Sequence, residues 1–544
     1  MQTSLLWFAA LGPLVLAAVA AIPVRVAEPR HRARVVRDAA QAAAAIALVG
    51  ALAVAVAVAV RGPLTTGLVG HAGVGLSLAL DALSASMLLL VSFIGLVVLR
   101  YARHYLDGDP GQPRFVARLC ATLAAVLTLI IAGNLLPFAA AWIATSLGLH
   151  GLLVFYRERA AAVLAARKKW LVSRAGDLCL ALAVVLVYAA VGSLEHADIR
   201  AAAIQGELSL PLHVAAVLLA LTALLKSAQF PLHGWLLDVM ETPTPVSALL
   251  HAGIVNAGGF LVLRYADLVG ASPFALHLLA LVGGFTALVA SVVMLTQTSI
   301  KVALAWSTVA QMGFMLLQCG LGAWSAALLH IVAHSLYKAH AFLSSGSVMD
   351  VQRAAWAPTP GGQPHPARIA LALTLVLGTA GVAAALFGVT PVSKPGVFAL
   401  GAVMALGLVH LVANAIDERP STYVIGMTLA RAAVVALAWL ALQASAEHLT
   451  ASALPATAPL TGALDAVIVL LVVLSFAALT LFQGWLPRVA ESPRWQAWHT
   501  HVVNGFYVNT LSNRIVLALW PSAQLMAGTS QVAAQTFPTA GDRA

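Results

Sequence analysis

The chain has 544 residues, of which 61% are hydrophobic and only 9% are charged. A water-soluble protein carries about 25% charged residues, so this composition excludes a soluble fold, and it also excludes disordered, collagen-like and disulfide-rich classes. The net charge of +10 lies mainly in short loops between apolar runs. Such a distribution marks the cytoplasmic side of a membrane and does not indicate nucleic-acid binding.

Apolar runs long enough to cross the hydrocarbon layer recur along almost the whole chain. They predict an all-α polytopic membrane protein with about fifteen transmembrane helices. The predicted spans are residues 4–22, 39–60, 76–99, 115–132, 135–156, 172–191, 211–240, 245–264, 273–296, 301–320, 324–345, 367–394, 396–416, 424–444 and 463–483. No charge precedes Arg25, so we expect the first span to be retained rather than cleaved as a signal peptide.

Charge in the connecting loops predicts the orientation of these spans. The loops after the first, third and fifth spans are rich in Arg and Lys, and the last of them includes Lys168 and Lys169, whereas the loops after the second, fourth and sixth contain only Arg61 and Arg200. The positive-inside rule therefore places the N-terminus outside and the tail from Arg488 inside.

Other segments are less regular. The polar connections are too short to bury a core of their own, so we expect any catalytic domain to belong to a partner. The segment from Trp495 to Trp520 has no clean apolar run and suits a helix that lies at the membrane interface or docks on a neighbour. The cysteines have neither Cys-x-x-Cys nor Cys/His spacing, and we expect no metal and no cofactor in this chain; they are Cys120, Cys179 and Cys319.

Lys226 is the most informative charge inside a predicted span, because a charge at that depth is costly unless it faces a partner or water. Pro231 lacks an N–H and its ring clashes with the carbonyl of Ser227, so we expect a helix break one turn beyond Lys226. Such breaks bind ions or water, which suits a proton relay. The alternatives are a lysine that reaches the interface and a fixed ion pair with Asp177 or Asp238.

Histidines stand in two of the predicted spans. His251 lies among small and apolar residues and is either a proton-exchanging group or a satisfied hydrogen-bonding group. His330, His334 and Lys338 are spaced i, i+4, i+8, which stacks them on one helix face with steps of about 6 Å that one water can bridge. This column indicates proton conduction. A metal site at the two histidines is the competing interpretation, but it lacks a third ligand.

The other charges near the spans are less specific. Asp177 begins the sixth span and is expected to pair with Arg174, three residues earlier. Lys394 stands between Pro391 and Pro395 near the predicted outer end of the twelfth span, where it is either an exit group or a solvated lysine. The remaining charges have no other ionisable residues or motif nearby in the sequence, so we expect structural roles for them; they are Asp81, Arg431 and Asp465.

One stretch resembles the proton-conducting membrane transporter family, which includes antiporter-like subunits of respiratory complex I and Mrp cation/proton antiporters. Residues 226–253 read Lys-Ser-Ala-Gln-Phe-Pro-Leu-His-Gly-Trp-Leu-Leu-Asp-Val-Met-Glu-Thr-Pro-Thr-Pro-Val-Ser-Ala-Leu-Leu-His-Ala-Gly. Supporting matches occur at residues 166–177, 301–314 and 330–347. Together the matches cover roughly residues 75–350.

The resemblance implies two inverted five-helix repeats, broken seventh and twelfth helices, and a polar axis of Lys and His at mid-membrane. By motif position, the axis residues are Lys226, His251, His334 and Lys338, with His330 beside them and Lys394 in the place of an exit lysine. The chain then divides into N-terminal helices, a first repeat, a second repeat and C-terminal helices with an interfacial tail, over residues 1–114, 115–264, 265–420 and 421–544.

One departure from the family pattern concerns the fifth helix. Family members that pump protons carry a Trp-Glu pair there, and the Glu partners the lysine of the seventh helix. This chain reads Trp142-Ile143 at that place. The missing carboxylate favours a subunit that passes protons downhill, with Asp177 as a substitute counter-charge for Lys226.

Residues 142–150, 155–159 and 504–507 are similar to the DabB branch of this family, the membrane subunits of bacterial inorganic-carbon pumps. The resemblance implies a non-enzymatic coupling subunit in the bacterial cytoplasmic membrane. It also implies a DabA-like zinc partner, related to β-carbonic anhydrase, that converts CO2 to bicarbonate. The alternatives are a proton-pumping subunit of an NADH:quinone oxidoreductase and an Mrp-type Na+/H+ antiporter subunit. The missing carboxylate and the short tail weigh against both.

Overall fold

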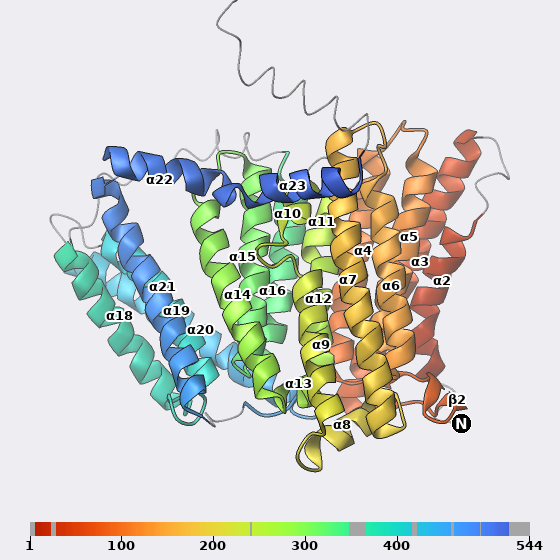
Figure 1. Ribbon diagram of the computed structural model, residues 1–544, viewed down its shortest axis with the longest axis horizontal. Coiled ribbons are helices and arrows are strands. Elements are labelled where there is room, and N and C mark those ends of the chain that lie inside the picture. The colour runs from red at the N-terminus through yellow and green to blue at the C-terminus, as the bar shows by residue number, and fades with distance from the viewer. Residues whose placement is uncertain are drawn as a thin grey trace, which may run out of the picture.

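The computed structural model describes residues 6–22, 29–239, 242–346, 366–415, 421–457, 462–489 and 491–521. Long helices run side by side through one block, and two further helices lie across one end of it (Figure 1). Within the described ranges, eleven helices are long and apolar enough to cross a membrane, and three apolar helices are shorter. The all-α membrane fold is therefore confirmed, while the count of about fifteen crossings and the two inverted repeats stay predictions.

The first part of the chain ends at the predicted break in the seventh helix. Its elements are η1 (Trp7–Ala10), α2 (Leu11–Ala20), α3 (Pro29–Arg61), β1 (Leu64–Thr65), β2 (Val69–His71), β3 (Val74–Leu76), β4 (Ala79–Leu80), α4 (Ala82–Tyr105), α5 (Gln112–Ile131), α6 (Leu135–Leu153), α7 (Ala160–Val191), α8 (His196–Ile204) and α9 (Leu210–Lys226). The four short strands were not predicted. They form two antiparallel pairs, β1 with β4 and β2 with β3.

The third predicted span began too early, because residues 76–81 belong to the strands and their turn. Helix α4 starts at Ala82, where Asp81 and Ser84 cap it reciprocally. The Asp81 carboxylate accepts from the Ser84 N–H at 2.8 Å, and Ser84 Oγ accepts from the Asp81 N–H at 2.7 Å. Such a capping box satisfies two of the backbone donors that a helix start leaves free.

The middle of the chain holds short helices around two interruptions, followed by three long helices. Its elements are α10 (Gly234–Asp238), α11 (Thr244–Ala252), η3 (Ile254–Asn256), α12 (Ala257–Arg264), α13 (Ala266–Gly270), α14 (Pro273–Met294), α15 (Ile300–Gly320) and α16 (Trp324–Leu343). Helices α14 and α15 cross very closely at Gly283 and Gly313. A Cβ added at Gly313 would lie 2.6 Å from the Gly283 carbonyl oxygen, so the crossing depends on the absent side chain.

The last part of the chain begins after residue 365. Its elements are α18 (Pro366–Leu386), α19 (Pro395–Ala415), α20 (Thr422–Thr450), α21 (Ala463–Val489), α22 (Pro493–Val503), η4 (Gly505–Tyr507) and α23 (Val508–Leu519). The break expected in the twelfth helix falls at the end of α18, where Gly388 has a positive φ of 65°. The chain then turns into α19 at Pro395, so the prolines separate two helices instead of interrupting one.

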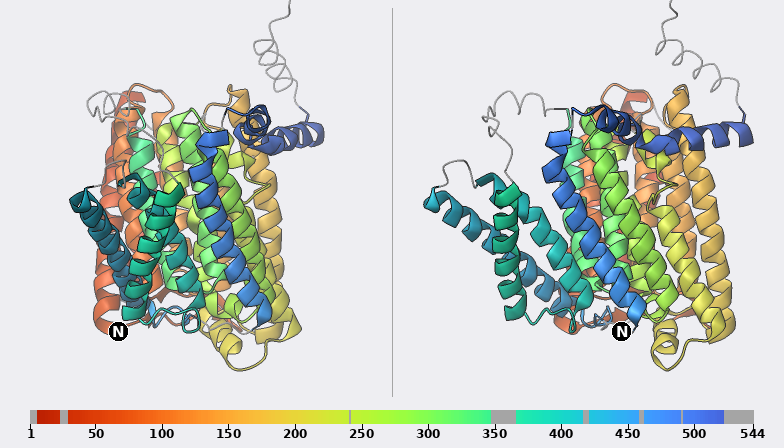
Figure 2. Two further views of the ribbon diagram at one scale, coloured as in Figure 1. Left: turned by 90° about the vertical axis from the view of Figure 1, so that its left-hand side faces the viewer. Right: turned by 60° about the vertical axis from the view of Figure 1, so that its left-hand side comes forward.

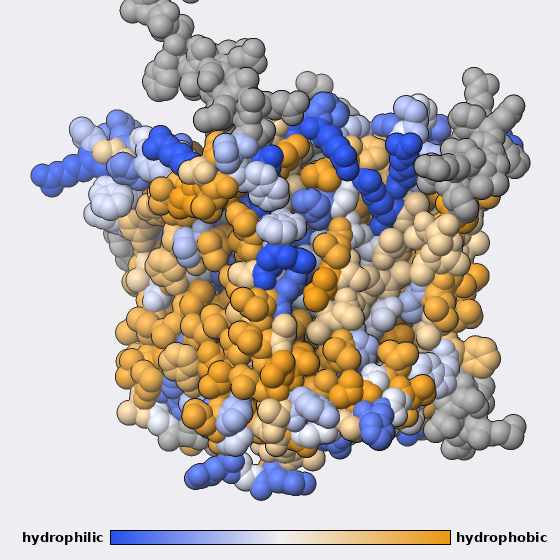
Figure 3. Space-filling model, turned by 45° about the vertical axis from the view of Figure 1, so that its right-hand side comes forward, coloured by the Kyte–Doolittle hydropathy of each residue, from blue (hydrophilic) through white to orange (hydrophobic). Residues whose placement is uncertain are grey.

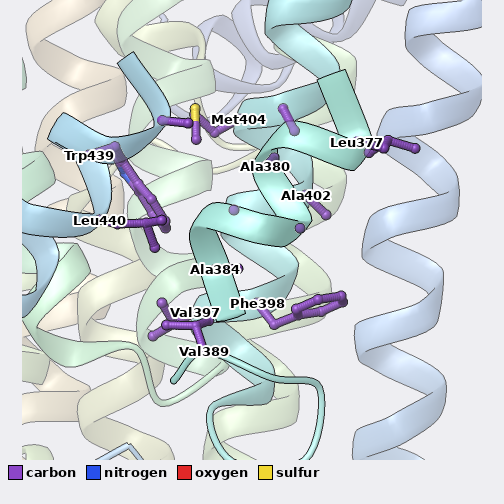
Figure 4. A pocket seen from close by; sticks show the side chains of 14 residues that line it. Leu377, Ala380, Ala384, Val389, Val397, Phe398, Ala402, Met404, Trp439 and Leu440 are labelled. Atoms are coloured by element: carbon purple, nitrogen blue, oxygen red, sulfur yellow. The ribbon is translucent and has the colours of Figure 1, made fainter. Parts of the chain in front are cut away.

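The surface fits a protein surrounded by lipid. One face carries a broad hydrophobic band, with hydrophilic side chains gathered mostly at its two ends and a smaller hydrophilic streak near its middle (Figure 3). Helices α18, α19 and α20 form a smaller group that leans away from the main bundle (Figure 2). Between these three helices lies a partly open pocket of about 290 Å³ lined by apolar residues such as Met404, Trp439 and Leu440 (Figure 4). With no ionisable lining residue, this pocket offers no step for a proton.

Candidate proton pathway

The helix break lies at Lys226 itself, one turn earlier than the sequence predicts. Helix α9 ends at Lys226, and the backbone two residues later, at Ala228, has a positive φ of 50°. The short helix α10 begins only at Gly234. The lysine therefore stands at the end of a half-helix in the interior of the bundle, where its side chain is only 7% exposed.

Nearby side chains take up the backbone groups that the break leaves free. Gln229 Nε2 donates to the Ser227 carbonyl oxygen at 2.7 Å, which is the carbonyl that Pro231 was expected to release. The Phe230 N–H donates to Thr286 Oγ1 of α14 at 3.1 Å. The interruption is thus held in place by specific hydrogen bonds, as buried backbone groups require.

The Lys226 ammonium faces an aromatic ring. Its Nζ atom lies 4.5 Å from the centroid of the Trp142 ring on α6, a geometry in which the π face attracts a cation. Lys226 Nζ is buried and has no hydrogen-bond partner among the described residues. Ile143, which follows Trp142, offers no charge. The seventh-helix lysine therefore contacts an aromatic face at the position where pumping relatives are expected to supply a carboxylate.

The two acids considered as fixed partners of Lys226 are paired with other residues. Asp238 forms an ion pair with Lys168, so a fixed Lys226–Asp238 pair is excluded. Asp177 pairs with Arg174 at 2.5 Å, as its position three residues away indicated. Its role as a counter-charge therefore stays a prediction.

Lys168 and Lys169 are buried in α7 and do not lie in a loop, which corrects the sequence interpretation. Each side chain is about 3% exposed. Lys169 Nζ donates to the Ser146 carbonyl oxygen at 2.6 Å and to Ser146 Oγ at 2.7 Å. Helix α7 starts at Ala160, whereas the predicted sixth span started at residue 172. The prediction therefore left out the first twelve residues of the helix, which include both lysines.

Lys168 contacts both the C-terminal helix α23 and the short helix α10 that follows the break. Its Nζ pairs with Asp238 at the end of α10 and donates to Asn509 Oδ1 at 2.7 Å and Asn513 Oδ1 at 2.6 Å. Asn509 Nδ2 completes the cluster by donating to Asp238 Oδ1 at 2.9 Å. The predicted interfacial segment is thus α22 and α23, which lie across the end of the bundle, with α23 beside α7 and α10 and α22 beside α14 (Figures 1 and 2).

His251 lies at a second helix interruption, which the sequence analysis missed. Helix α11 ends at Ala252, and Gly253 leaves helical geometry with φ −129° and ψ −72°. His251 Nδ1 lies 3.0 Å from Thr308 Oγ1, and that hydroxyl donates to the Leu304 carbonyl oxygen at 3.0 Å. The hydroxyl has one proton, so Nδ1–H donates to it. Nε2, which has no partner among the residues that the structure describes, is then an open acceptor.

The expected column on α16 is present. The rings of His330 and His334 have centroids 5.9 Å apart. His330 Nδ1 is hydrogen-bonded to Gln318 Oε1 at 2.8 Å, and His334 Nε2 to the backbone carbonyl oxygen of His251 at 3.2 Å. The structure therefore brings the α16 column against the last turn of α11, and each imidazole keeps one nitrogen that can accept a proton.

Lys338 and His251 are connected through adjacent hydroxyls of α15. Lys338 Nζ donates to Ser307 Oγ at 2.7 Å and to the Leu304 carbonyl oxygen at 2.9 Å. Ser307 is followed by Thr308, the partner of His251. These hydroxyls were missed as site residues, although the stretch that contains them was among the family matches.

The remaining charges that the sequence singled out lie away from these hydrogen bonds, and most of them form ion pairs. Lys394 pairs with Glu447 of α20 at 2.7 Å, and both side chains are about one-third exposed, so the solvated and exit interpretations both stay open. The charges expected to be structural are placed as follows: Asp81 pairs with Arg264 at 2.6 Å, Asp465 with His277 at 2.6 Å, and Arg431 is exposed on α20. Among the described residues, no group of three or more His, Cys, Asp and Glu side chains is placed to hold a metal ion.

Two family models match the chain. The model described as NADH:quinone oxidoreductase/Mrp antiporter, TM, matches residues 132–385. The model described as NADH-Ubiquinone oxidoreductase (complex I), chain 5 N-terminus, matches residues 68–116. These matches contain α4, the Lys226 break, His251 and the α16 column.

Curated relatives and a solved structure agree with these models. The chain is 42% identical to the probable inorganic carbon transporter subunit DabB2 of Halothiobacillus neapolitanus over 462 residues, 83% of this chain and 82% of the relative. It is 39% identical to NADH-quinone oxidoreductase subunit L of Escherichia coli over 284 residues, 52% of this chain and 46% of that one. A chain of the Mrp complex from Dietzia sp. is 26% identical with a TM-score of 0.63, and the alignment covers 97% of this chain and 60% of that chain.

Proposed function

The chain belongs to the NADH:quinone oxidoreductase/Mrp antiporter family of membrane subunits, in its DabB branch, and from that premise we propose that it conducts protons to energise inorganic-carbon accumulation. The proposed partner is a DabA-like zinc subunit related to carbonic anhydrase, which converts CO2 to bicarbonate. In this proposal catalysis belongs to the partner, and the chain is a coupling subunit of the bacterial cytoplasmic membrane with its Arg-rich loops inside.

The line of protonatable groups in the bundle is the observation that supports this proposal most. His251 is hydrogen-bonded to Thr308 at 3.0 Å, and Lys338 is hydrogen-bonded to Ser307 at 2.7 Å. Ser307 and Thr308 are neighbours in the chain, so the two bonds lie side by side. Imidazoles and amines exchange protons readily, and hydroxyls orient them. Between Lys226 and His251 the described structure gives no direct contact, so bridging water is part of the proposal.

The proposed direction of proton flux is downhill, from outside to inside. Among the described residues Lys226 has no ion-paired carboxylate, so no strong ion pair must be broken at each transfer. One proton that crosses 100 mV releases about 2.3 kcal/mol, which shifts a two-state equilibrium in a partner by roughly fifty-fold. In the proposed partner, a bias of this size would favour hydration of CO2 over the reverse reaction.

Accumulation of bicarbonate in cells that express the chain together with its neighbouring subunits tests the proposal. Lys226→Ala should abolish uptake that depends on the proton-motive force while the complex still assembles. Lys301→Ala makes the same chemical change at the start of α15, and it should leave uptake near the wild-type rate. Normal uptake by an assembled Lys226→Ala variant would contradict the proposal.

Purification of the intact complex tests the proposed partner separately. A large zinc protein in stoichiometric amount is the expected companion. The two alternative functions predict other companions, namely NADH:quinone oxidoreductase subunits or several small Mrp subunits. Either result would replace inorganic-carbon accumulation with redox-driven pumping or with Na+/H+ exchange.

A further inference from the structure

Aromatic rings stand next to Lys226 on the side toward α8. Phe138 stands one turn before Trp142 on α6, and their ring centroids are 6.3 Å apart with an angle of 25° between the planes. Phe260 of α12 stacks on Phe138 at 6.2 Å. Phe138, Trp142 and Phe260 are each at most 1% exposed. The Phe138 ring is therefore packed between aromatic neighbours beside the ring that Lys226 contacts.

Two polar side chains, those of Tyr265 and His196, contact the Phe138 ring on the side away from Lys226. Tyr265 meets the Phe138 ring edge-on at 5.7 Å, and His196 lies at 6.4 Å. The Tyr265 hydroxyl and His196 Nδ1 are hydrogen-bonded at 3.1 Å. Tyr265 is buried, whereas His196 is only half-buried at the start of α8, which lies at the end of the bundle opposite α22 and α23 (Figure 1).

A carboxylate completes this polar group. Glu195 precedes His196 and accepts hydrogen bonds from Ser77 Oγ at 2.8 Å and from Asn134 Nδ2 at 2.7 Å. None of the ion pairs among the described residues involves Glu195, and Arg264 is paired with Asp81. Glu195, His196 and Tyr265 thus form a titratable group at the outer end of the bundle, which we call the outer site.

Among the described residues, the contacts that lead from Tyr265 to Lys226 run through the rings of Phe138 and Trp142. A benzene ring has no exchangeable proton and no lone pair, so a proton cannot pass from Tyr265 to Lys226 while the Phe138 ring fills the gap. We propose that Phe138 is the barrier between Lys226 and an outward-facing site in which the Glu195 carboxylate exchanges protons, with the neutral His196 and Tyr265 beside it. Displacement of its ring admits water and connects the outer site to Lys226.

This proposal rests on proton conduction through Lys226. Passive proton flux into vesicles that contain the native complex, measured with an enclosed pH dye and no added inorganic carbon, tests it. Phe138→Ala should raise this flux several-fold above the wild type, because water replaces the ring. The added flux should disappear in the double variant Phe138→Ala/Lys226→Ala, because the opened path leads to that amine.

Phe115→Ala provides a matched control. Phe115 is fully buried like Phe138 but packs on Phe155, outside the row of rings that ends at Lys226. Its removal leaves a cavity of similar size and should not raise the flux. If Phe138→Ala does not assemble, Phe138→Leu keeps much of the packing but removes the ring, and it should still raise the flux above the wild type.

The outer site is tested by Glu195→Gln, which should lower the flux of the Phe138→Ala background several-fold. Glu207→Gln, an exposed carboxylate beyond α8, should leave it unchanged. Wild-type flux in an assembled Phe138 variant, equal flux in Phe115→Ala, or a leak that survives Lys226→Ala would overturn the barrier assignment. If Lys226→Ala leaves the ordinary wild-type flux intact, the proposed function itself fails.

Discussion

Lys226 Nζ lies over the Trp142 ring at 4.5 Å, with no hydrogen-bond partner among the described residues. A cation–π contact stabilises a desolvated ammonium by about 2 kcal/mol, which is weaker than a buried ion pair with good geometry. The lysine can therefore give up or gain its proton without breaking a strong bond. This relationship is the physical reason to expect easy proton exchange at the break.

A carboxylate restored at position 143 should slow conduction. In Ile143→Glu the new side chain follows Trp142 directly and is expected to pair with Lys226, which fixes the charged form of the amine. We expect a several-fold lower proton flux in vesicles. Ile143→Gln has nearly the same size without the charge and should conduct close to the wild-type rate; equal flux in Ile143→Glu and the wild type would contradict this expectation.

The C-terminal segment should loosen when its two asparagines are removed. Asn509 and Asn513 both accept hydrogen bonds from the buried Lys168 ammonium. The double change to Ala leaves these protons unpaired, which costs about 1–3 kcal/mol for each lost hydrogen bond. Limited proteolysis should then cleave between α21 and α23 faster than in the wild type. Thr510→Ala, an exposed position between them, should not alter the rate.

The glycine crossing of α14 and α15 should not tolerate a larger side chain. At Gly313 a Cβ would lie 2.6 Å from the Gly283 carbonyl oxygen, so Gly313→Val must push the two helices apart. Overpacking of this kind costs about 1–3 kcal/mol, and the midpoint of thermal unfolding in detergent should fall. Gly378→Ala on α18, where nothing lies within 4 Å, should leave the midpoint unchanged; a drop of the same size there would show that the close crossing is not the cause.

The outer site should make folding sensitive to acid. Burial, together with the charge of Arg264, lowers the pKa of His196 to about 3, while nearby Asp81 acts in the opposite direction. A histidine in the unfolded chain titrates near pH 6.5. As pH falls from about 6.5 to about 3, the unfolded state therefore binds a proton that the folded state does not bind, which favours unfolding. Stability contributed by the neutral imidazole is present above pH 6.5 and is lost below it.

The thermal midpoint should therefore fall between pH 7.5 and pH 5, and His196→Gln should reduce that fall because Gln does not titrate. His71→Gln, at an exposed position in β2, serves as the control and should retain the wild-type dependence. An unchanged pH dependence in His196→Gln would show that this imidazole is not the source.

Much of the fold follows from local sequence. A run such as residues 39–60 must cross the membrane wherever its neighbours lie, and α3 includes it. The spacing of His330, His334 and Lys338 sets their common face, because helix geometry alone fixes it. Pro231 predicts that the helix breaks. The break begins at Lys226 because hydrogen bonds that involve Gln229 and Thr286, the latter on a distant helix, hold the following residues, and no local sequence pattern contains those contacts.

The features that the sequence did not reveal involve contacts between distant segments. Lys168 was counted as a loop charge, because its partners Asp238 and Asn509 come from remote parts of the chain. The roles of Ser307 and Thr308 became visible only when α15 was placed beside His251 and Lys338. A hydroxyl or an amide acquires a function through its neighbour, and composition and periodicity do not identify neighbours.

Proton flux driven by an imposed pH gradient, in vesicles that contain the native complex, tests the central claim most directly. The His334→Ala/Lys338→Ala double variant removes two basic groups from the line and leaves the Lys226 break intact. Flux reduced to that of protein-free vesicles is the predicted result. Wild-type flux in an assembled double variant would mean that protons do not follow this line, and conduction through it would have to be abandoned.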